Sequence, residues 1–205
     1  MYEEFRINLL HKYLRKMRKI IWTIMALCTL SGCKCENSTI SADSLLDFVD
    51  PLIGTGGHGH TFPGAAYPFG MVQLSPDTGL EGWDWCSGYH YSDSSIIGFS
   101  HTHLSGTGRS DLMDVMMPVT GNLKLSPGSK SKPDEGYRSR FSHDEESASP
   151  GYYKVRLKDY DIMAELTVSP RCGFHRYTFP ESESSHIILD LSHHFATDSV
   201  LFTSI

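Results

Sequence analysis

The sequence predicts an all-β fold, an antiparallel β-sandwich, on two main observations. Between residues 153 and 191, four short segments alternate apolar and polar residues and are separated by turn residues at nearly regular intervals. No long amphipathic helix pattern follows the first 32 residues. Because a half-buried strand must cover its apolar face, two packed antiparallel sheets are the natural architecture. An apolar content of 40% and a charged content of 20% exclude a disordered chain.

The expected elements can be placed in order along the chain. One helical turn is expected at 44–48, and the segment 121–149 is expected to form turns and a long surface excursion. Proline cannot donate to a ladder, so Pro76 is expected to help end the first strand and Pro118 to mark an edge or terminal strand. Strands are expected at 70–74, 94–99, 112–119, 153–157, 162–168, 174–179 and 186–191.

The N-terminus has the pattern of an export signal. A basic cluster at 15–19 precedes an uncharged apolar run at 20–30, which is too short to span a bilayer but suits a signal-peptide core. The following Leu-Ser-Gly-Cys resembles a bacterial lipobox, which implies cleavage before Cys33 and attachment of lipid to it. A plain secretory signal is the alternative, and Met17 is a second candidate start.

These features divide the chain into three parts. We expect a lipoprotein signal peptide at 1–32, a polar tether at 33–46 and one folded domain at 47–205, exported and anchored to a membrane in the periplasm or at the cell surface. Without residues 1–32, 12 basic and 22 acidic residues remain, a net charge of −10. The domain lacks a basic patch, which argues against a nucleic-acid partner. Cys86 and Cys172, the cysteines of this domain, either pair or are both free thiols.

The stretch 82–108 stands out in composition. It holds two Trp, two Tyr, three His, two Asp and one Cys in twenty-seven residues. Aromatic faces beside short polar groups suit a sugar, which has an apolar C–H face and a polar rim. Trp83 and Trp85 are expected to share one face of a strand, and a core position is the alternative for each. Asp93 is interpreted as a turn or cap residue.

A glycine-rich loop lies upstream of this stretch. Residues 54–59 match G-x-G-x-x-G, but Pro63 and Pro68 exclude the helix that a dinucleotide-binding loop requires. The loop is instead expected to expose its backbone to a ligand. Two H-x-H pairs, 58/60 and 101/103, would suit zinc in principle, but no carboxylate or cysteine partner has a persuasive spacing. Sugar contact, support of the site loops and a purely structural role remain open for each histidine.

Five strings carry a resemblance to a known family. They are DPLIGTGGHGHTFPGA (50–65), PFGMVQLSPDT (68–78), GWDWCSGYHYSD (82–93), GFSHTHLSGTG (98–108) and GFHRYTFP (173–180). Together they resemble the N-terminal domain of glycoside hydrolase family 92, a family of α-mannosidases of which many act on α-1,2 linkages. The resemblance covers residues 47 to 200, nearly the whole predicted domain.

The resemblance implies a β-sandwich packed against a large (α/α)₆-barrel domain, with the active site between them. It also implies calcium-dependent, inverting removal of mannose from glycans, which needs a carboxylic acid and a carboxylate base roughly 6.5–9.5 Å apart. In the family those carboxylates and most calcium contacts come from the barrel. The sequence is therefore interpreted as truncated at its C-terminal end and inactive alone, and the alternative is a non-catalytic carbohydrate-binding remnant.

The resemblance also suggests individual roles. Trp83 would face the sugar next to the scissile mannose, and Arg109 would pair with a carboxylate of the barrel. Cys86 beside Ser87 suits a nucleophile, but a buried or site-lining thiol fits the family better. No catalytic residue and no metal ligand is assigned. The expected sugar-contacting residues are Trp83, Asp84, Cys86, His58, His60, His101 and His103.

Overall fold

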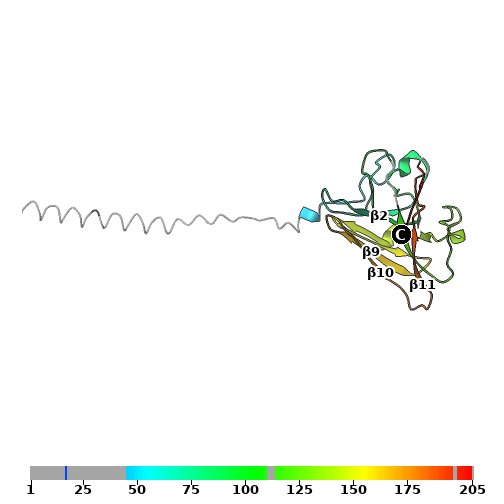
Figure 1. The fold of residues 1–205 in the computed structure, drawn as a ribbon. Helices are drawn as coiled ribbons and strands as arrows, with labels where there is room; N and C mark the ends of the chain where they lie inside the picture. Colours follow the sequence, from blue (N-terminus) through cyan, green and yellow to red (C-terminus); the bar gives the residue numbers. More distant parts are fainter. Residues whose placement is uncertain (1–16, 18–44, 110–113, 196–197, 205) are drawn as a thin grey trace, which may run out of the picture. The chain divides into compact units, whose positions relative to one another are not determined.

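The computed structural model describes residues 17, 45–109, 114–195 and 198–204 (Figure 1). The chain divides into two compact units, Met1–Ile40 and Ser41–Ile205, and the fold below is that of the second. The export signal, Cys33 and most of the expected tether lie outside the described residues, so those expectations stay predictions. Within the described part of the chain, no helix has the length and apolarity needed to cross a membrane.

The second unit is built from antiparallel sheets, which confirms the predicted all-β fold (Figure 1). The four-stranded sheet has the order β10 (Gly173–Thr178), β9 (Ile162–Val168), β8 (Tyr152–Leu157) and β7 (Glu146–Ser149). The five-stranded sheet has the order β1 (Ala65–Ala66), β2 (Gln73–Asp77), β4 (Gly98–Ser100), β5 (Val115–Thr120) and β11 (Ser185–Asp190). A small third sheet pairs β3 (Ser95–Ile96) with β6 (Ser139–Arg140).

The core lies between the two larger sheets, where β1 and β2 pack against β9. Tyr153, Val155 and Leu157 on β8 are fully buried, as are alternate residues of β9, and this confirms the predicted alternation. From the other sheet Leu74 and Phe99 join the same cluster. Burial of each large apolar side chain stabilises the fold by about 1.5–3 kcal/mol, so this shared core holds the two sheets together.

Two proline expectations were wrong, for one physical reason. Pro76 lies inside β2, which runs from Gln73 to Asp77, and Pro118 lies inside β5, which β4 and β11 flank. Pro76 is past the end of β1, which pairs only with Gln73 and Leu74. Pro118 is likewise past the end of β4, whose pairing with β5 stops at Met116. Each proline therefore occupies a position with a strand on one side only, where its missing N–H costs no ladder bond.

The segment 121–149 also differs from the expected surface excursion. It contains β6, β7 and two 3₁₀ turns, η2 (Pro133–Glu135) and η3 (His143–Glu145). Tyr137 and Phe141 are buried in the main core, and Arg138 between them is 3% exposed. The sequence did not predict the burial of these three residues, because they are few, lack a regular period and lie in a segment of polar composition.

Candidate functional site

The glycine-rich loop at 54–59 is a tight turn that presents two histidines. Gly54 and Gly57 have φ values of +84° and +56°, which glycine adopts without steric cost. A Cβ atom on Gly59 would lie 2.0 Å from the Gly54 carbonyl oxygen, so the backbone passes too close for any side chain. His60 then takes a φ of +54°, which is unfavourable for a residue with a Cβ atom and is the kind of strain found at binding sites.

Trp83 and Trp85 lie on a 3₁₀ turn, η1 (Trp83–Trp85), and not on a strand as expected. Three residues complete one turn of such a helix, so residues two apart point in different directions. Trp83 is 61% exposed, whereas Trp85 is partly buried. The Trp85 indole N–H donates to Asp93 Oδ2 at 2.7 Å, so the Asp93 carboxylate holds an aromatic side chain. The Asp93 N–H donates to the His90 carbonyl oxygen at 3.0 Å, which confirms the turn position predicted for this residue.

The two segments meet in a group that we call the Trp83 cluster: Trp83, Asp84, His58 and His60. The His60 ring lies edge-on to the Trp83 ring with 4.2 Å between centroids, and the His58 ring is tilted at 5.6 Å. His58 Nδ1 is 2.6 Å from Asp84 Oδ1, and His60 Nε2 is 3.5 Å from the same oxygen. The cluster therefore combines an exposed aromatic face with three polar groups.

The far end of the 82–108 stretch closes against this cluster. The Gly106 N–H donates to the His60 carbonyl oxygen at 2.6 Å. A Cβ atom on Gly108 would lie 2.9 Å from Trp83 Nε1, so only glycine lets the chain pass along the indole edge. Arg109, which follows, is exposed.

The electrostatics of the Trp83 cluster favour hydrogen bonding to a neutral polar ligand. The hydrogen bond from His58 holds the pKa of Asp84 below its usual range, so the carboxylate is an acceptor at neutral pH. His58 is 75% exposed at its side chain, whereas His60 is buried, with Nε2 3.5 Å from Asp84 Oδ1. An exposed indole face, a carboxylate and an exposed imidazole are groups that hold one face and one edge of a sugar ring.

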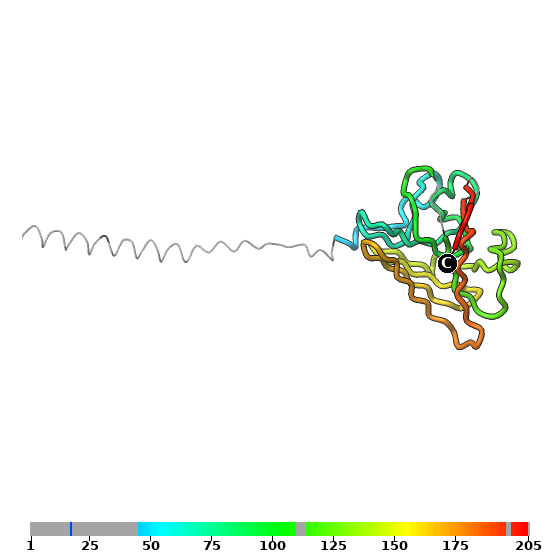
Figure 2. Tube along the Cα trace, in the orientation of Figure 1, coloured from blue at the N-terminus to red at the C-terminus, as the bar shows by residue number. Residues whose placement is uncertain are grey.

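The second histidine pair is placed differently. His103 is buried: its Nδ1 donates to the Gln73 carbonyl oxygen at 2.8 Å, and its Nε2 lies 2.9 Å from Asp77 Oδ1. The C-terminal segment, red in Figure 2, follows β11. On it His193 donates from Nε2 to Asp77 Oδ2 at 2.9 Å. We call Asp77, His103 and His193 the Asp77 cluster, and all three are buried.

The side chains of His101 and Cys86 make their contacts away from the Trp83 cluster. His101 Nδ1 is 3.1 Å from Asp114 Oδ2, and its Nε2 is 3.0 Å from His175 Nε2. Cys86 is 3% exposed and packs against Phe195. Burial raises the pKa of the Cys86 thiol, which disfavours the thiolate that a nucleophile requires.

Two other expectations concern cysteines and metals. Cys86 is a buried free thiol and Cys172 an exposed one, so these two do not pair. In the part of the chain that the structure describes, no group of three or more His, Cys, Asp or Glu side chains is arranged to hold a metal ion. We assign none of the described residues to calcium.

Sequence reasoning missed the role of Asp77 and His193. Asp77 was assigned to a strand end and His193 to no element, and 116 positions separate them in the chain. No local spacing signals such a contact. The one available hint is the need of a buried carboxylate for donors, which becomes visible only once Asp77 is known to be fully buried.

Comparison with known proteins identifies this architecture. Residues 48–205 match the family model described as the glycosyl hydrolase family 92 N-terminal domain. A relative from Arthroderma benhamiae, named an uncharacterized secreted glycosidase, is 32% identical over 149 residues, which is 68% of this chain and 18% of the relative.

Two solved structures from Bacteroides thetaiotaomicron are also similar. A family GH92 α-mannosidase in complex with mannoimidazole has a TM-score of 0.71 at 51% identity, over 73% of this chain and 20% of that chain. A family GH92 inverting mannosidase has a TM-score of 0.58 at 32% identity, over 70% and 19%. The chain spans about a fifth of the length of these relatives. It belongs to glycosyl hydrolase family 92, whose N-terminal domain it contains.

Proposed function

We propose that this domain forms one wall of the mannose-binding site of an exported, inverting exo-α-mannosidase that acts on α-1,2-linked glycans. The observation that carries the proposal is the exposed Trp83 face, framed by His58, His60 and Asp84, in a chain of this family. The solved relatives named as α-mannosidases support the substrate class, and one of them is named as inverting.

Each member of the Trp83 cluster has a distinct role in the proposal. The indole face of Trp83 stacks on the C–H face of a mannose ring, which contributes apolar contact that water cannot replace. Asp84 accepts a hydrogen bond from a sugar hydroxyl through Oδ2, since both histidines lie against its other oxygen, Oδ1. His58 orients that carboxylate through its 2.6 Å bond, and the buried His60 ring packs edge-on against Trp83.

The chemistry of hydrolysis is assigned elsewhere in the proposal. Inversion needs one carboxylic acid on the leaving oxygen and one carboxylate behind the attacking water. We propose that a barrel domain of the kind the family resemblance implies supplies both groups, together with the calcium of the whole enzyme. Residues of this chain then bind and orient the sugar, and no proton transfer is assigned to them.

The location of the protein is part of the same proposal. A signal pattern ahead of Cys33 and a relative named as secreted both support export, and the lipobox-like residues support a lipid on Cys33. Metabolic labelling with a radioactive fatty acid should mark the chain, and Cys33→Ser should remove the label. An unlabelled wild-type chain that is still exported would leave the plain secretory signal as the correct interpretation.

Calorimetric titration of the chain with α-1,2-mannobiose tests the sugar-binding wall. Trp83→Ala should weaken binding by about tenfold, because a stacked aromatic contributes roughly 0.5–1.5 kcal/mol beyond its area. Trp83→Tyr should keep most of the affinity, since it keeps an aromatic face.

The matched control is Phe174→Ala on β10, which removes another aromatic of similar exposure, 55%, outside the cluster. An affinity that ignores Trp83→Ala, or that falls equally with Phe174→Ala, would remove Trp83 from the proposal. A second measurement tests where the acid and base lie. We expect this 205-residue chain to bind mannobiose without releasing mannose, and turnover would overturn our placement of the acid and base.

A further inference from the structure

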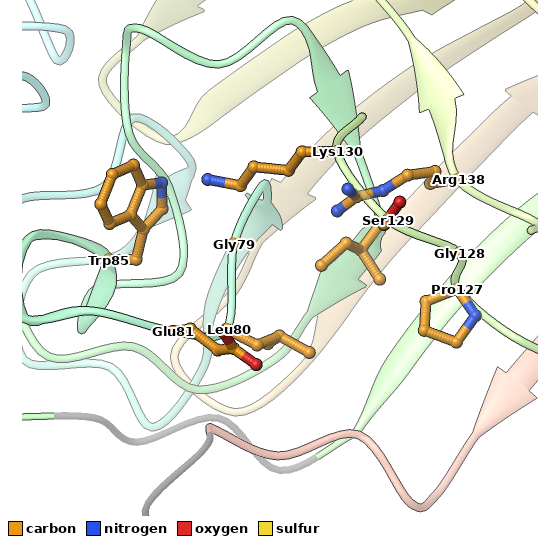
Figure 3. A pocket seen from close by; sticks show the side chains of 10 residues that line it. Gly79, Leu80, Glu81, Trp85, Pro127, Gly128, Ser129, Lys130 and Arg138 are labelled. Atoms are coloured by element: carbon orange, nitrogen blue, oxygen red, sulfur yellow. The ribbon is translucent and has the colours of Figure 1, made fainter. Parts of the chain in front are cut away.

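A cavity of about 390 Å³ lies beside the turn that carries the two tryptophans, on the side of Trp85 (Figure 3). Its apolar wall is formed by Leu80, Ile97 and Pro127, and its polar wall by Lys130 and Arg138. In Figure 3 the guanidinium group of Arg138 points into the cavity, toward the side where Lys130 and Trp85 lie. None of these residues belongs to the Trp83 cluster.

Arg138 is the unusual feature of this cavity. It is 3% exposed, and its Nη2 donates to the Thr78 carbonyl oxygen at 3.2 Å. Its Nε is buried and has no hydrogen-bond partner. Leaving a buried donor without an acceptor costs about 1–3 kcal/mol of stability, and more for a charged group. Such a donor in a stable fold therefore indicates that an acceptor from outside the chain binds to it.

The other charges around the cavity do not neutralise Arg138. Lys130 Nζ lies 3.9 Å from the Trp85 ring centroid and is ion-paired with Asp93 Oδ2 at 2.7 Å. The Asp93 carboxylate is thus already shared between Lys130 and the Trp85 indole, and Glu81 is exposed and lies across the cavity from Lys130 (Figure 3). Among the described residues, no carboxylate forms an ion pair with Arg138; burial lowers the pKa of Arg138, and the charge of Asp93 offsets this only in part, from beyond ion-pair distance.

We propose that this cavity binds the carboxylate of a small organic acid, with the acid's ring or chain against the apolar wall. A guanidinium group matches a carboxylate in geometry, and its buried position strengthens the pair. Arg138 has no ion-pair partner among the described residues, so one negative charge matches it, which favours a carboxylate over a doubly charged phosphate. Leu80, Ile97 and Pro127 favour a ligand with an apolar side. The inference does not depend on the proposed mannose site.

Two kinds of acid share this chemistry, a hexuronic acid and an apolar ring acid, and the test separates them. In the ¹⁵N-labelled full chain, the Arg138 Nε–H resonance is assigned through its own backbone and followed during titration. We expect it to shift with glucuronate or with cyclohexanecarboxylate, and the acid that shifts it at the lower concentration identifies the source. Glucose and the methyl ester of glucuronate, which lack the charge, are the controls and should leave it in place.

Variants give the second measurement. Arg138→Gln should weaken binding of the acid at least tenfold, and Lys130→Met should weaken it about threefold while keeping a side chain over Trp85. If Arg138→Gln does not fold, Lys130→Met and the wild-type resonance still decide the matter. An unmoved Arg138 resonance, an equal shift with the neutral ester, or an affinity unchanged by Lys130→Met would each overturn the proposal.

Discussion

The Trp83 cluster and the Asp77 cluster contain the same titratable groups, one aspartate and two histidines, in opposite surroundings. Around Asp84, one histidine is close and largely exposed and the other is 3.5 Å away. Around Asp77, both histidines lie at 2.9 Å, one on each oxygen, and all three side chains are within 1% of full burial. One carboxylate keeps an oxygen for a ligand, whereas the other has both oxygens engaged.

The two carboxylates are both ionised at neutral pH, in different surroundings. Burial alone would raise the pKa of Asp77, but the charge and hydrogen bonds of His103 and His193 outweigh it and hold the pKa well below its usual range. His103 donates from Nδ1 to the Gln73 carbonyl oxygen, and its Nε2 lies 2.9 Å from Asp77 Oδ1. The Asp77 cluster is therefore a buried, hydrogen-bonded group that joins β2 to the C-terminal segment.

The largest expected effect comes from Asp77→Asn. It removes the charged partner of two buried histidines, and breaking a buried pair in this way costs about 3–5 kcal/mol. Urea denaturation should show this loss, and acid should remove the same contribution in the wild type as the pH falls below about 4, because the folded pKa is depressed.

The matched substitution in the exposed cluster is Asp84→Asn. Solvent and salt screen this carboxylate, so the urea midpoint should stay nearly unchanged. Equal losses of stability in Asp77→Asn and Asp84→Asn would break the comparison, because burial would then not decide which carboxylate is structural.

A smaller effect is expected from His175, which lies between the two extremes in burial. Burial lowers the pKa of His175 to about 4, so the unfolded chain binds a proton that the folded chain does not between about pH 6.5 and pH 4. Acidification across that range should remove about 2 kcal/mol of stability from the wild type. His175→Gln should flatten this dependence, and a parallel pH profile in the variant would contradict the assignment.

The smallest effect concerns binding through Asp84. Asp84→Asn keeps one acceptor oxygen but loses the charge, so the affinity for α-1,2-mannobiose should fall by about fivefold. Asp134→Asn on η2 is the control, since it removes an exposed carboxylate from outside the Trp83 cluster. Affinities that fall alike in both variants would indicate a general effect of net charge.

The sequence predictions were most accurate where a strand pairs with its neighbour in the chain. The sheet β10-β9-β8-β7 pairs each strand with its neighbour in the chain, so local alternation was enough to predict β8 and β9. In the other sheet, β11 pairs with β5 across a long stretch of sequence. There the start of β2 was placed three residues early, because a strand's limits depend on where its neighbours end.

The candidate site shows the same division. Composition alone indicated that 82–108 and the loop before it carry the ligand-binding groups, and the family strings pointed to Trp83. Spacing could not separate His60 from His103, since both end an H-x-H pair. Nor could it show that Trp83 and Trp85 point apart, because a 3₁₀ turn and a strand are equally compatible with W-D-W.

The sequence by itself determined the family and the all-β class, because these depend on residue types and local periodicity, and it led to Trp83 as the candidate aromatic contact. Tertiary structure alone decided which carboxylate is free to meet a ligand. Asp77 is enclosed by His103 and by a histidine 116 positions away, whereas Asp84 stays at the surface with a vacant oxygen. Burial is a property of all the segments that surround a residue, and only the folded chain brings those segments together.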